Sequence, residues 1–288
     1  LLGAGLVSQP TAGLYTAGSF IAGAAGHAAG GLASTNQVAG VRALVGTPFK
    51  GNLGLTYLQA AGPFAAVGYN RADVYGADFN AQLGNFPVTL IWSQSRTKGE
   101  GVADIKKNNN AFDGAVGLAF GKLGVDLGYR DIGSNFGAPG YWSKLGRWTN
   151  PTNVRGPYAN LTYGMAGNLS FMANGEFYKG RKTIAAQDVI DEKSDKVWRA
   201  EGGLKWGFTG KSSLNLGWEY IRWDPNEAGA GRTKEQYINV GLAHEIGPSA
   251  AVNIGYQIVD YKPGAVAAPY GGAEYKGGIA VAQLNAKF

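Results

Sequence analysis

Apolar and polar side chains alternate every second residue through most of this sequence. In residues 158–180, YANLTYGMAGNLSFMANGEFYKG, Leu161 and Tyr163 alternate with Asn160 and Thr162, and the alternation resumes after a Gly-Asn turn. Successive side chains of a β-strand point to opposite faces, so this pattern predicts a hairpin with one apolar and one polar face. The same design recurs in residues 196–223, KVWRAEGGLKWGFTGKSSLNLGWEYIRW.

The hairpins follow one another without a helical period, a linker or a compositional break. The remaining predicted hairpins span residues 39–58, 71–96, 112–130 and 237–260, and a last strand spans 273–288. The chain has 47 Gly, 15 Tyr and 12 Phe, a composition that disfavours helices and suits strands. We therefore expect an all-β, antiparallel array of about 14 to 16 strands, in one domain spanning residues 1–288.

Connections between the predicted strands alternate regularly in length. One set has two to four residues rich in Gly, Asn and Lys, whereas the other set is long, at residues 23–35, 97–109, 133–153, 180–195 and 225–231. A soluble sandwich has no reason to sort its loops in this way. Short turns at one end and long loops at the other are typical of a transmembrane β-barrel.

The width of the predicted barrel decides which face of the strands points outward. A barrel of about fifteen strands is wider than side chains can fill, since an eight-stranded barrel is already near that limit. A soluble barrel would have to pack all of these apolar faces into one interior. With the apolar face toward lipid and the polar face toward water, every position is satisfied, and closure pairs the backbone groups.

Aromatic residues mark both ends of the predicted apolar face. Such residues form two girdles at the interfaces of a membrane barrel. The lipid-facing girdle residues are Trp92, Trp198, Trp206, Trp218, Tyr220 and Tyr256.

The last strand resembles that of bacterial outer-membrane porin-type β-barrels. Leu284 and Phe288 lie on its predicted lipid face, with an aromatic residue at the very end, whereas Ala286 is smaller than the usual residue. In that family the terminal aromatic strand is the signal read by the barrel-assembly machinery, so the resemblance assigns this role to Leu284 and Phe288.

A narrower resemblance lies in residues 129–158, YRDIGSNFGAPGYWSKLGRWTNPTNVRGPY. This segment is similar to outer-membrane barrels that carry S-layer homology domains in the Deinococcus–Thermus lineage. The resemblance implies a longer polypeptide, of which this chain is the C-terminal part of a larger barrel, and a homotrimer. It also implies upstream domains that bind peptidoglycan or the S-layer.

Charges of both signs fall on the predicted inward face. They are Arg42, Asp78, Asp113, Asp126, Arg130, Glu176, Arg199, Glu201, Lys205, Glu219 and Glu235. Opposed acidic and basic walls can set a transverse field that tunes ion selectivity at a constriction. The alternative is that these side chains only hydrogen-bond and solvate the wall.

The long loop at residues 133–153 is rich in aromatic residues and proline. Leaving such a loop open in water is costly. We expect it to fold on itself, to pack into the pore as a constriction, or to contact a neighbouring subunit.

Other chemistry finds little support. The chain has no Cys, which excludes thiolate metal sites and thiol nucleophiles, and neither His27 nor His244 has an identifiable base and orienting partner. The net charge of +6 comes mostly from loops and turns, without the basic stripe and exposed aromatics of a nucleic-acid-binding surface. We therefore expect no enzyme, cofactor, metal site or nucleic-acid partner.

The sequence thus predicts an integral outer-membrane porin for passive diffusion of small hydrophilic solutes and ions. Its expected partners are outer-membrane lipids. Its long loops are expected to be extracellular, and its short turns and C-terminus periplasmic. The alternative is a structural envelope protein whose barrel anchors an S-layer or cell-wall tether.

Overall fold

The fold was analysed in a computed structural model, in which nearly all described residues belong to strands. The structure describes residues 2–4, 37–64, 69–99, 104–138, 144–146, 148–165, 167–184, 190–226, 231–264 and 274–286. The strands are β1 (Leu2–Ala4), β2 (Gln37–Thr47), β3 (Gly51–Phe64), β4 (Tyr69–Leu83), β5 (Phe86–Gly99), β6 (Asn110–Phe120), β7 (Leu123–Ile132), β8 (Lys144–Leu145), β9 (Trp148–Thr149), β10 (Val154–Gly164), β11 (Leu169–Gly180), β12 (Lys196–Thr209), β13 (Ser212–Asp224), β14 (Thr233–Gly247), β15 (Ala250–Lys262) and β16 (Tyr275–Ala286). Within these residues, no helix has the length and apolar character needed to cross a membrane.

Strands that are neighbours in the sequence are neighbours in the sheet. A 14-stranded sheet runs in the order β1 to β7 and then β10 to β16, and β8 and β9 form a separate two-stranded ribbon. The pairs are antiparallel, as the long ladders β4 to β5 and β14 to β15 show. All six hairpins predicted from the sequence, and the final strand, are confirmed.

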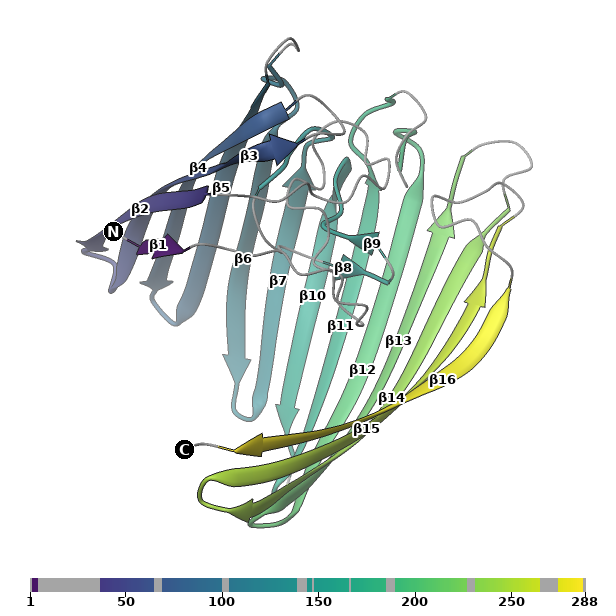
Figure 1. Cartoon of the computed structure of the whole chain (residues 1–288). Coiled ribbons are helices and arrows are strands. Elements are labelled where there is room, and N and C mark those ends of the chain that lie inside the picture. The colour runs from purple at the N-terminus through teal and green to yellow at the C-terminus, as the bar shows by residue number, and fades with distance from the viewer. Residues whose placement is uncertain are drawn as a thin grey trace. The chain divides into compact units, whose positions relative to one another are not determined.

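The chain divides into two compact units. Unit 1 comprises Leu1–Val116, Gly128–Pro157 and Tyr178–Asp195, and unit 2 comprises Gly117–Leu127, Tyr158–Phe177 and Lys196–Phe288. Figure 1 shows β2 to β5 side by side in unit 1 and β12 to β16 side by side in unit 2.

Glycine makes two of the tight turns possible. Gly84 and Gly121 have φ angles of +64° and +60°, and each occupies the first position of a two-residue turn. Side chains with a Cβ rarely adopt this left-handed conformation, and glycine at the first position is typical of type II′ hairpins. These turns fix the registers β4 to β5 and β6 to β7.

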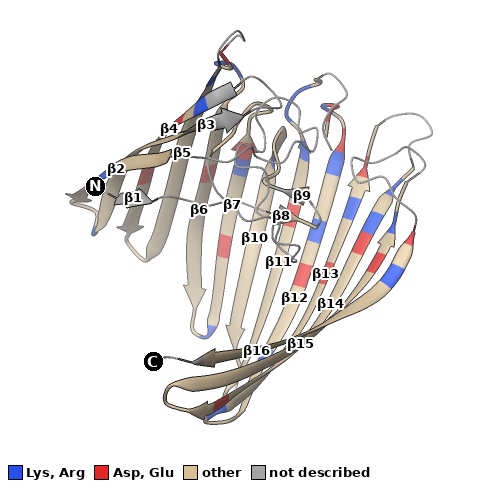
Figure 2. Cartoon of the chain, viewed as in Figure 1, with Lys and Arg blue, Asp and Glu red and all other residues tan. Residues whose placement is uncertain are grey.

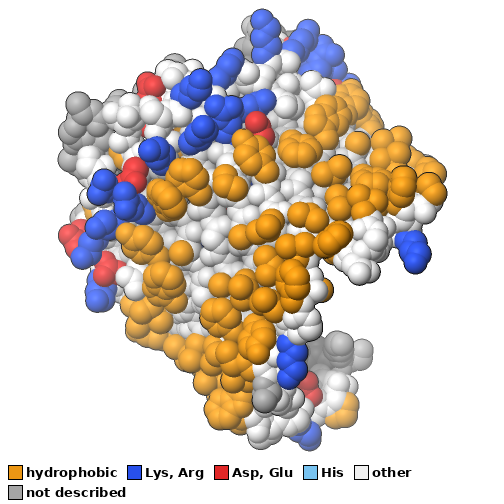
Figure 3. Space-filling model, turned by 180° about the vertical axis from the view of Figure 1, so that it is seen from behind, with side chains coloured by type: hydrophobic (Ala, Val, Ile, Leu, Met, Phe, Trp, Pro, Cys, Tyr) orange, Lys and Arg blue, Asp and Glu red, His pale blue; other side chains and the backbone are white. Residues whose placement is uncertain are grey.

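The registers separate the side chains into an apolar face and a polar face. Leu204, Leu216 and Val240 lie opposite one another across β12, β13 and β14, on the apolar face. The neighbouring set on the polar face includes Lys205 and Asn215. Leu216 and Val240 are 40% and 41% exposed, so their strands do not bury the apolar face. Figure 3 shows hydrophobic side chains gathered over one face, with Lys and Arg side chains mostly at its margins.

Most buried residues lie instead on the polar face, toward the ends of the strands that carry long connections. In unit 1 they include Ala60, Ala72 and Ser95, and in unit 2 they include Ile221 and Tyr261. The amide of Gly137 donates a hydrogen bond of 2.9 Å to Ser95 Oγ, so residues near 137 lie over the polar face of β5. The core of this protein is therefore formed by loop segments packed on the polar face.

Candidate functional site

The polar face of unit 1 carries an ion pair that spans three strands. Arg42 on β2 donates bidentately to Asp78 on β4, from Nη1 to Oδ1 at 2.7 Å and from Nη2 to Oδ2 at 2.8 Å. Nη1 also donates to Thr56 Oγ1 on β3, at 2.8 Å. The Arg42 side chain is 49% exposed, so this guanidinium faces solvent while being held in one orientation.

Gly54 makes room for this pair. It lies opposite Asp78 in the register, and a Cβ at this position would lie 2.5 Å from Arg42 Nη2 and 2.5 Å from Asp78 Oδ1. A larger residue would displace one partner. The absence of a side chain at Gly54 therefore lets the ion pair lie flat across β3.

A second ion pair on the polar face joins β6 and β7. Arg130 Nε donates to Asp113 Oδ2 at 2.7 Å, and the guanidinium lies 5.9 Å from the centroid of the Tyr178 ring. At this distance a cation and an aromatic face attract one another. Asp126, four residues before Arg130 on β7, shares its face by strand alternation and is exposed.

In unit 2, one guanidinium holds three carboxylates. Arg199 on β12 lies 2.6 Å from Glu176, 2.7 Å from Glu201 and 2.5 Å from Glu219, and it also donates to Asn174 at 3.0 Å. The Arg199 side chain is 16% exposed and the Glu176 side chain 9%. The group is acidic overall, because three negative charges surround one positive charge. We call these residues the Arg199 cluster.

Two further predicted residues share this face. Lys205, six residues beyond Arg199, is exposed. Glu235 lies on the same face but is only 1% exposed. Its carboxylate accepts hydrogen bonds from Trp223 Nε1 at 3.1 Å and from the Tyr237 hydroxyl at 2.7 Å. Glu235 thus stabilises the packed end of the polar face rather than meeting bulk solvent.

Carboxylates outnumber basic groups on this face, although the whole chain has a net charge of +6. Figure 2 shows residues of both signs on the strands of unit 2. Among the residues predicted for the inward face, the basic members are Arg42, Arg130, Arg199 and Lys205, and the acidic members are Asp78, Asp113, Asp126, Glu176, Glu201, Glu219 and Glu235. The excess of positive charge is therefore carried elsewhere on the molecule.

The loop at residues 133–153 was predicted to fold on itself, to pack into the pore or to contact a neighbouring subunit, and its described part forms the paired strands β8 and β9. Leu145 of β8 and Trp148 of β9 are 0% and 5% exposed. Asn153 Nδ2 donates to the carbonyl oxygens of Lys182 and Ile190, both at 2.8 Å, which fastens this loop to the next long connection. Together with the bond from Gly137 to Ser95, these contacts hold the segment on the polar side of β5.

The predicted girdle residues lie on the apolar face. Trp92, Trp198, Trp206, Trp218 and Tyr256 are between 41% and 49% exposed. Phe177 and Trp198 contact one another in a tilted arrangement with ring centroids 4.2 Å apart, and Trp218 and Tyr220 stack with centroids 6.2 Å apart. Leu284 is 67% exposed on the same face, whereas Phe288 lies outside the described residues.

The histidines give little sign of reaction chemistry. His244 Nδ1 lies 2.8 Å from Ser212 Oγ at an exposed short-turn end, and His27 lies outside the described residues. Within the part of the chain that the structure describes, no group of three His, Cys, Asp or Glu side chains is placed to hold a metal ion.

Sequence reasoning missed the uncharged members of the site and one whole charged group. Thr56, Gly54 and Asn174 complete the ion-pair clusters, and only the register reveals them. The missed group surrounds Asp73, on the apolar face of unit 1. Its signal was the odd numbering that Asp73 shares with Tyr75, which places both on one face of β4.

Comparison with known proteins identifies the kind of domain that carries this site. The model of the family described as "S-layer protein SlpA, beta-barrel domain" matches residues 10–254. No curated protein matches the sequence significantly.

Several solved structures resemble the chain at low sequence identity. OmpT, an outer membrane protein of Vibrio cholerae, is 13% identical, with 87% of this chain and 89% of that chain covered and a TM-score of 0.45. An anion-selective porin from Comamonas acidovorans is 12% identical, with coverages of 89% and 90% and a TM-score of 0.42. A FadL homologue of Pseudomonas aeruginosa is 10% identical, with coverages of 92% and 82% and a TM-score of 0.40.

Proposed function

Since this chain belongs to the family of the S-layer protein SlpA β-barrel domain, we propose that it forms an outer-membrane barrel with a water-filled interior. Small hydrophilic solutes and ions diffuse passively through that interior. The family confirms both the all-β barrel and the relation to S-layer-associated proteins that the sequence predicted.

The two faces of the sheet support this orientation. Hydrocarbon tolerates only backbone groups that are hydrogen-bonded within the protein, and it favours apolar side chains on the outside. Trp92, Leu216 and Tyr256 are large, exposed and on the apolar face, where lipid would cover them. In the opposite orientation, Arg42 and Lys205 would enter lipid, at a cost of about 2 to 4 kcal/mol each near the midplane.

The observation that carries the proposal is the charged polar face. Arg42 is held bidentately yet is half exposed, and the Arg199 cluster keeps three carboxylates around one guanidinium. Charged side chains on the wall of a pore select ions by attraction and repulsion at close range. The excess of carboxylates on this wall supports preference for cations over anions.

The loop held on the polar side of β5 adds a second element of a channel. Its contacts, from Gly137 to Ser95 and from Asn153 to Lys182, lie at the strand ends with long connections, which we place on the extracellular side. A loop fixed inside the wall narrows the passage and raises its selectivity by size. Short turns then face the periplasm.

A second function is favoured by the family description, which names an S-layer protein. In this alternative the barrel anchors a surface layer or a cell-wall tether, as a homotrimer, and loop segments such as the one over Ser95 plug the interior. The two proposals predict the same strands and differ in whether ions pass.

Reconstitution in a planar lipid bilayer separates them. The porin proposal predicts discrete conductance steps in about 1 M KCl. At this salt concentration the screening length falls to about 3 Å, and an open pore still conducts. Detergent without protein, and protein unfolded before addition, are the controls. Silent bilayers that contain folded, inserted protein would instead support the plugged anchor.

A further inference from the structure

A group of basic side chains lies on the outward, apolar face of unit 1, just beyond its aromatic residues. Arg71 on β4 and Lys98 on β5 are opposite one another in the register, as are Asp73 and Arg96. Directly opposed residues have Cβ atoms about 5 Å apart, so these side chains form one patch. Lys106, which follows β5, joins the patch through Asp104. We call Arg71, Arg96, Lys98 and Lys106 the basic patch.

Asp73 organises half of the patch. Its side chain is fully buried and accepts hydrogen bonds at Oδ1 from Arg71 Nε at 2.8 Å, Tyr57 Oη at 3.0 Å and Gln59 Nε2 at 3.1 Å. Lys98 Nζ lies 3.0 Å from its Oδ2. These contacts fix the two basic side chains, which remain 42% and 30% exposed.

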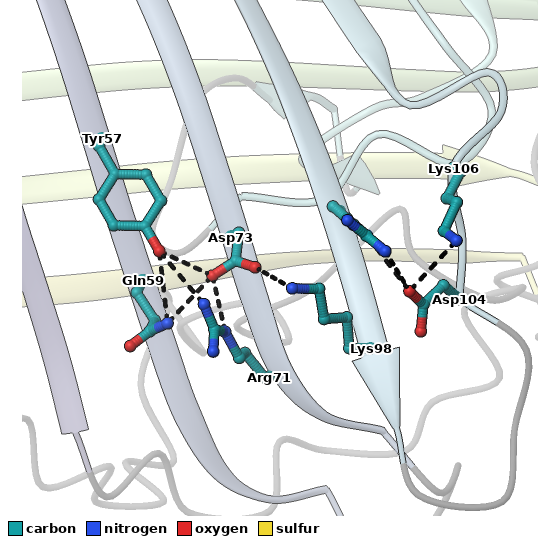
Figure 4. Close-up of polar contacts among 8 residues, drawn as sticks. Tyr57, Gln59, Arg71, Asp73, Lys98, Asp104 and Lys106 are labelled. Carbon is teal, nitrogen blue, oxygen red and sulfur yellow. Dashed lines mark hydrogen bonds and ion pairs between the residues drawn. The ribbon is translucent and has the colours of Figure 1, made fainter.

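Asp104 organises the other half in the same way. Arg96 Nη2 donates to Asp104 Oδ2 at 2.6 Å, and Lys106 Nζ lies 3.6 Å from the same oxygen. The exposed fractions are 39% for Arg96 and 59% for Lys106. Figure 4 shows the two groups beside each other, each carboxylate lying between basic side chains. Four cations and two carboxylates leave the patch positively charged.

The position of the patch matches the boundary of a membrane. Tyr57 and Tyr75 lie beside it with ring centroids 5.3 Å apart, and Leu55 and Trp92 continue the same face away from the long connections. These two apolar side chains are 52% and 41% exposed. Tyrosine at such a boundary is typical of the interfacial belt of membrane proteins.

We propose that the basic patch binds the phosphate of an anionic lipid headgroup, while the lipid chains lie on the adjoining apolar face. Arginine presents several N–H donors that suit phosphate oxygens, and lysine adds a compact positive charge. The buried Asp73 pre-orients the donors, so less side-chain freedom is lost on binding. This site depends on the outward orientation of the apolar face and is independent of whether the interior conducts ions.

Native mass spectrometry of the purified protein in detergent micelles tests the proposal. The probes are phosphatidylglycerol and phosphatidylcholine with identical chains, titrated against the wild type and two double variants. Lys98→Ala with Lys106→Ala removes two charges from the basic patch. Lys122→Ala with Lys211→Ala removes two charges from short turns and is the matched control.

The proposal predicts that the wild type prefers phosphatidylglycerol to phosphatidylcholine. The patch variant should lose about tenfold or more in affinity for phosphatidylglycerol, because each basic residue near an anionic lipid surface adds to the attraction. The control variant should keep the wild-type affinity. Equal binding of the two lipids, or equal losses in both variants, would overturn the proposal. Displacement of the bound lipid by millimolar glycerol phosphate would also overturn it, because the site would then recognise a free phosphate. Circular dichroism of each variant verifies that the strands have formed.

Discussion

Arg199→Gln tests how the charged wall controls ion passage. The substitution removes the only guanidinium of the Arg199 cluster, whose contacts with Glu176, Glu201 and Glu219 are 2.5 to 2.7 Å long. Three carboxylates then remain close together on the polar face. The variant should be less stable, by up to about 3 kcal/mol, since a partly buried carboxylate such as Glu176 loses its counter-charge.

The effect on selectivity follows from Coulomb's law. One added net negative charge about 7 Å from a passing ion in water changes the ion's energy by about 0.6 kcal/mol. The change has opposite signs for cations and anions, so the difference is about 1.2 kcal/mol, or about eightfold in the permeability ratio. For a wild type with an about twofold preference for cations, this corresponds to a shift of about 30 mV in reversal potential under a tenfold KCl gradient.

The assay is the reversal potential of the reconstituted protein in that gradient. Arg199→Gln should shift it toward the cation equilibrium value, and Lys211→Gln, which removes one charge at an exposed short turn, should leave it unchanged. Glu219→Gln should shift it in the opposite direction. A reversal potential that is identical in wild type and Arg199→Gln would refute the placement of this cluster on the conducting wall.

Three further predictions concern other contacts. Gly54→Ala should lower the free energy of unfolding by about 1 to 3 kcal/mol in urea titrations, because the new Cβ would collide with the ion pair of Arg42 and Asp78. Gly46→Ala is the control: its Cβ would enter open space, so its free energy of unfolding should stay within about 1 kcal/mol of wild type. Ser95→Ala removes the acceptor of the Gly137 amide, so hydrogen exchange at that amide should accelerate, and unchanged exchange would show that the bond does not hold the loop. The hydrogen bond from the Arg96 guanidinium lowers the pKa of Asp104, so this ion pair is complete at neutral pH and is lost as the pH falls through the lowered pKa. Carbon NMR of the Asp104 carboxyl should give a pKa below about 3.9, and an ordinary pKa would contradict the ion pair.

Much of the fold follows from local features of the sequence. Alternation in residues 196–223 places Trp198 and Trp218 on one face, and the structure puts them there with Ala200 between them on the ladder. Tight turns with Gly84 and Gly121 set the register, because glycine alone suits the first position of such turns.

Contacts across strands could be predicted only in part. Alternation shows that Arg42 and Asp78 point to polar faces, but their meeting depends on the exact register of three strands and on the empty space over Gly54. The burial of Glu235 likewise depends on Trp223 and Tyr237, which a strand pattern does not bring together. The basic patch was missed because charged residues were sought on the inward face alone, although strand ends near headgroups tolerate charge on the outward face.

The central claim is that the polar face lines a conducting path and the apolar face meets lipid. The chain contains no Cys, so single cysteines provide unique labels for each face. Asn215 and Leu216 are neighbours on β13 and lie on opposite faces. With Asn215→Cys, a charged, membrane-impermeant thiol reagent should reduce the single-channel conductance stepwise, whereas Leu216→Cys should not respond. A response at Leu216→Cys, or none at Asn215→Cys, would contradict the account.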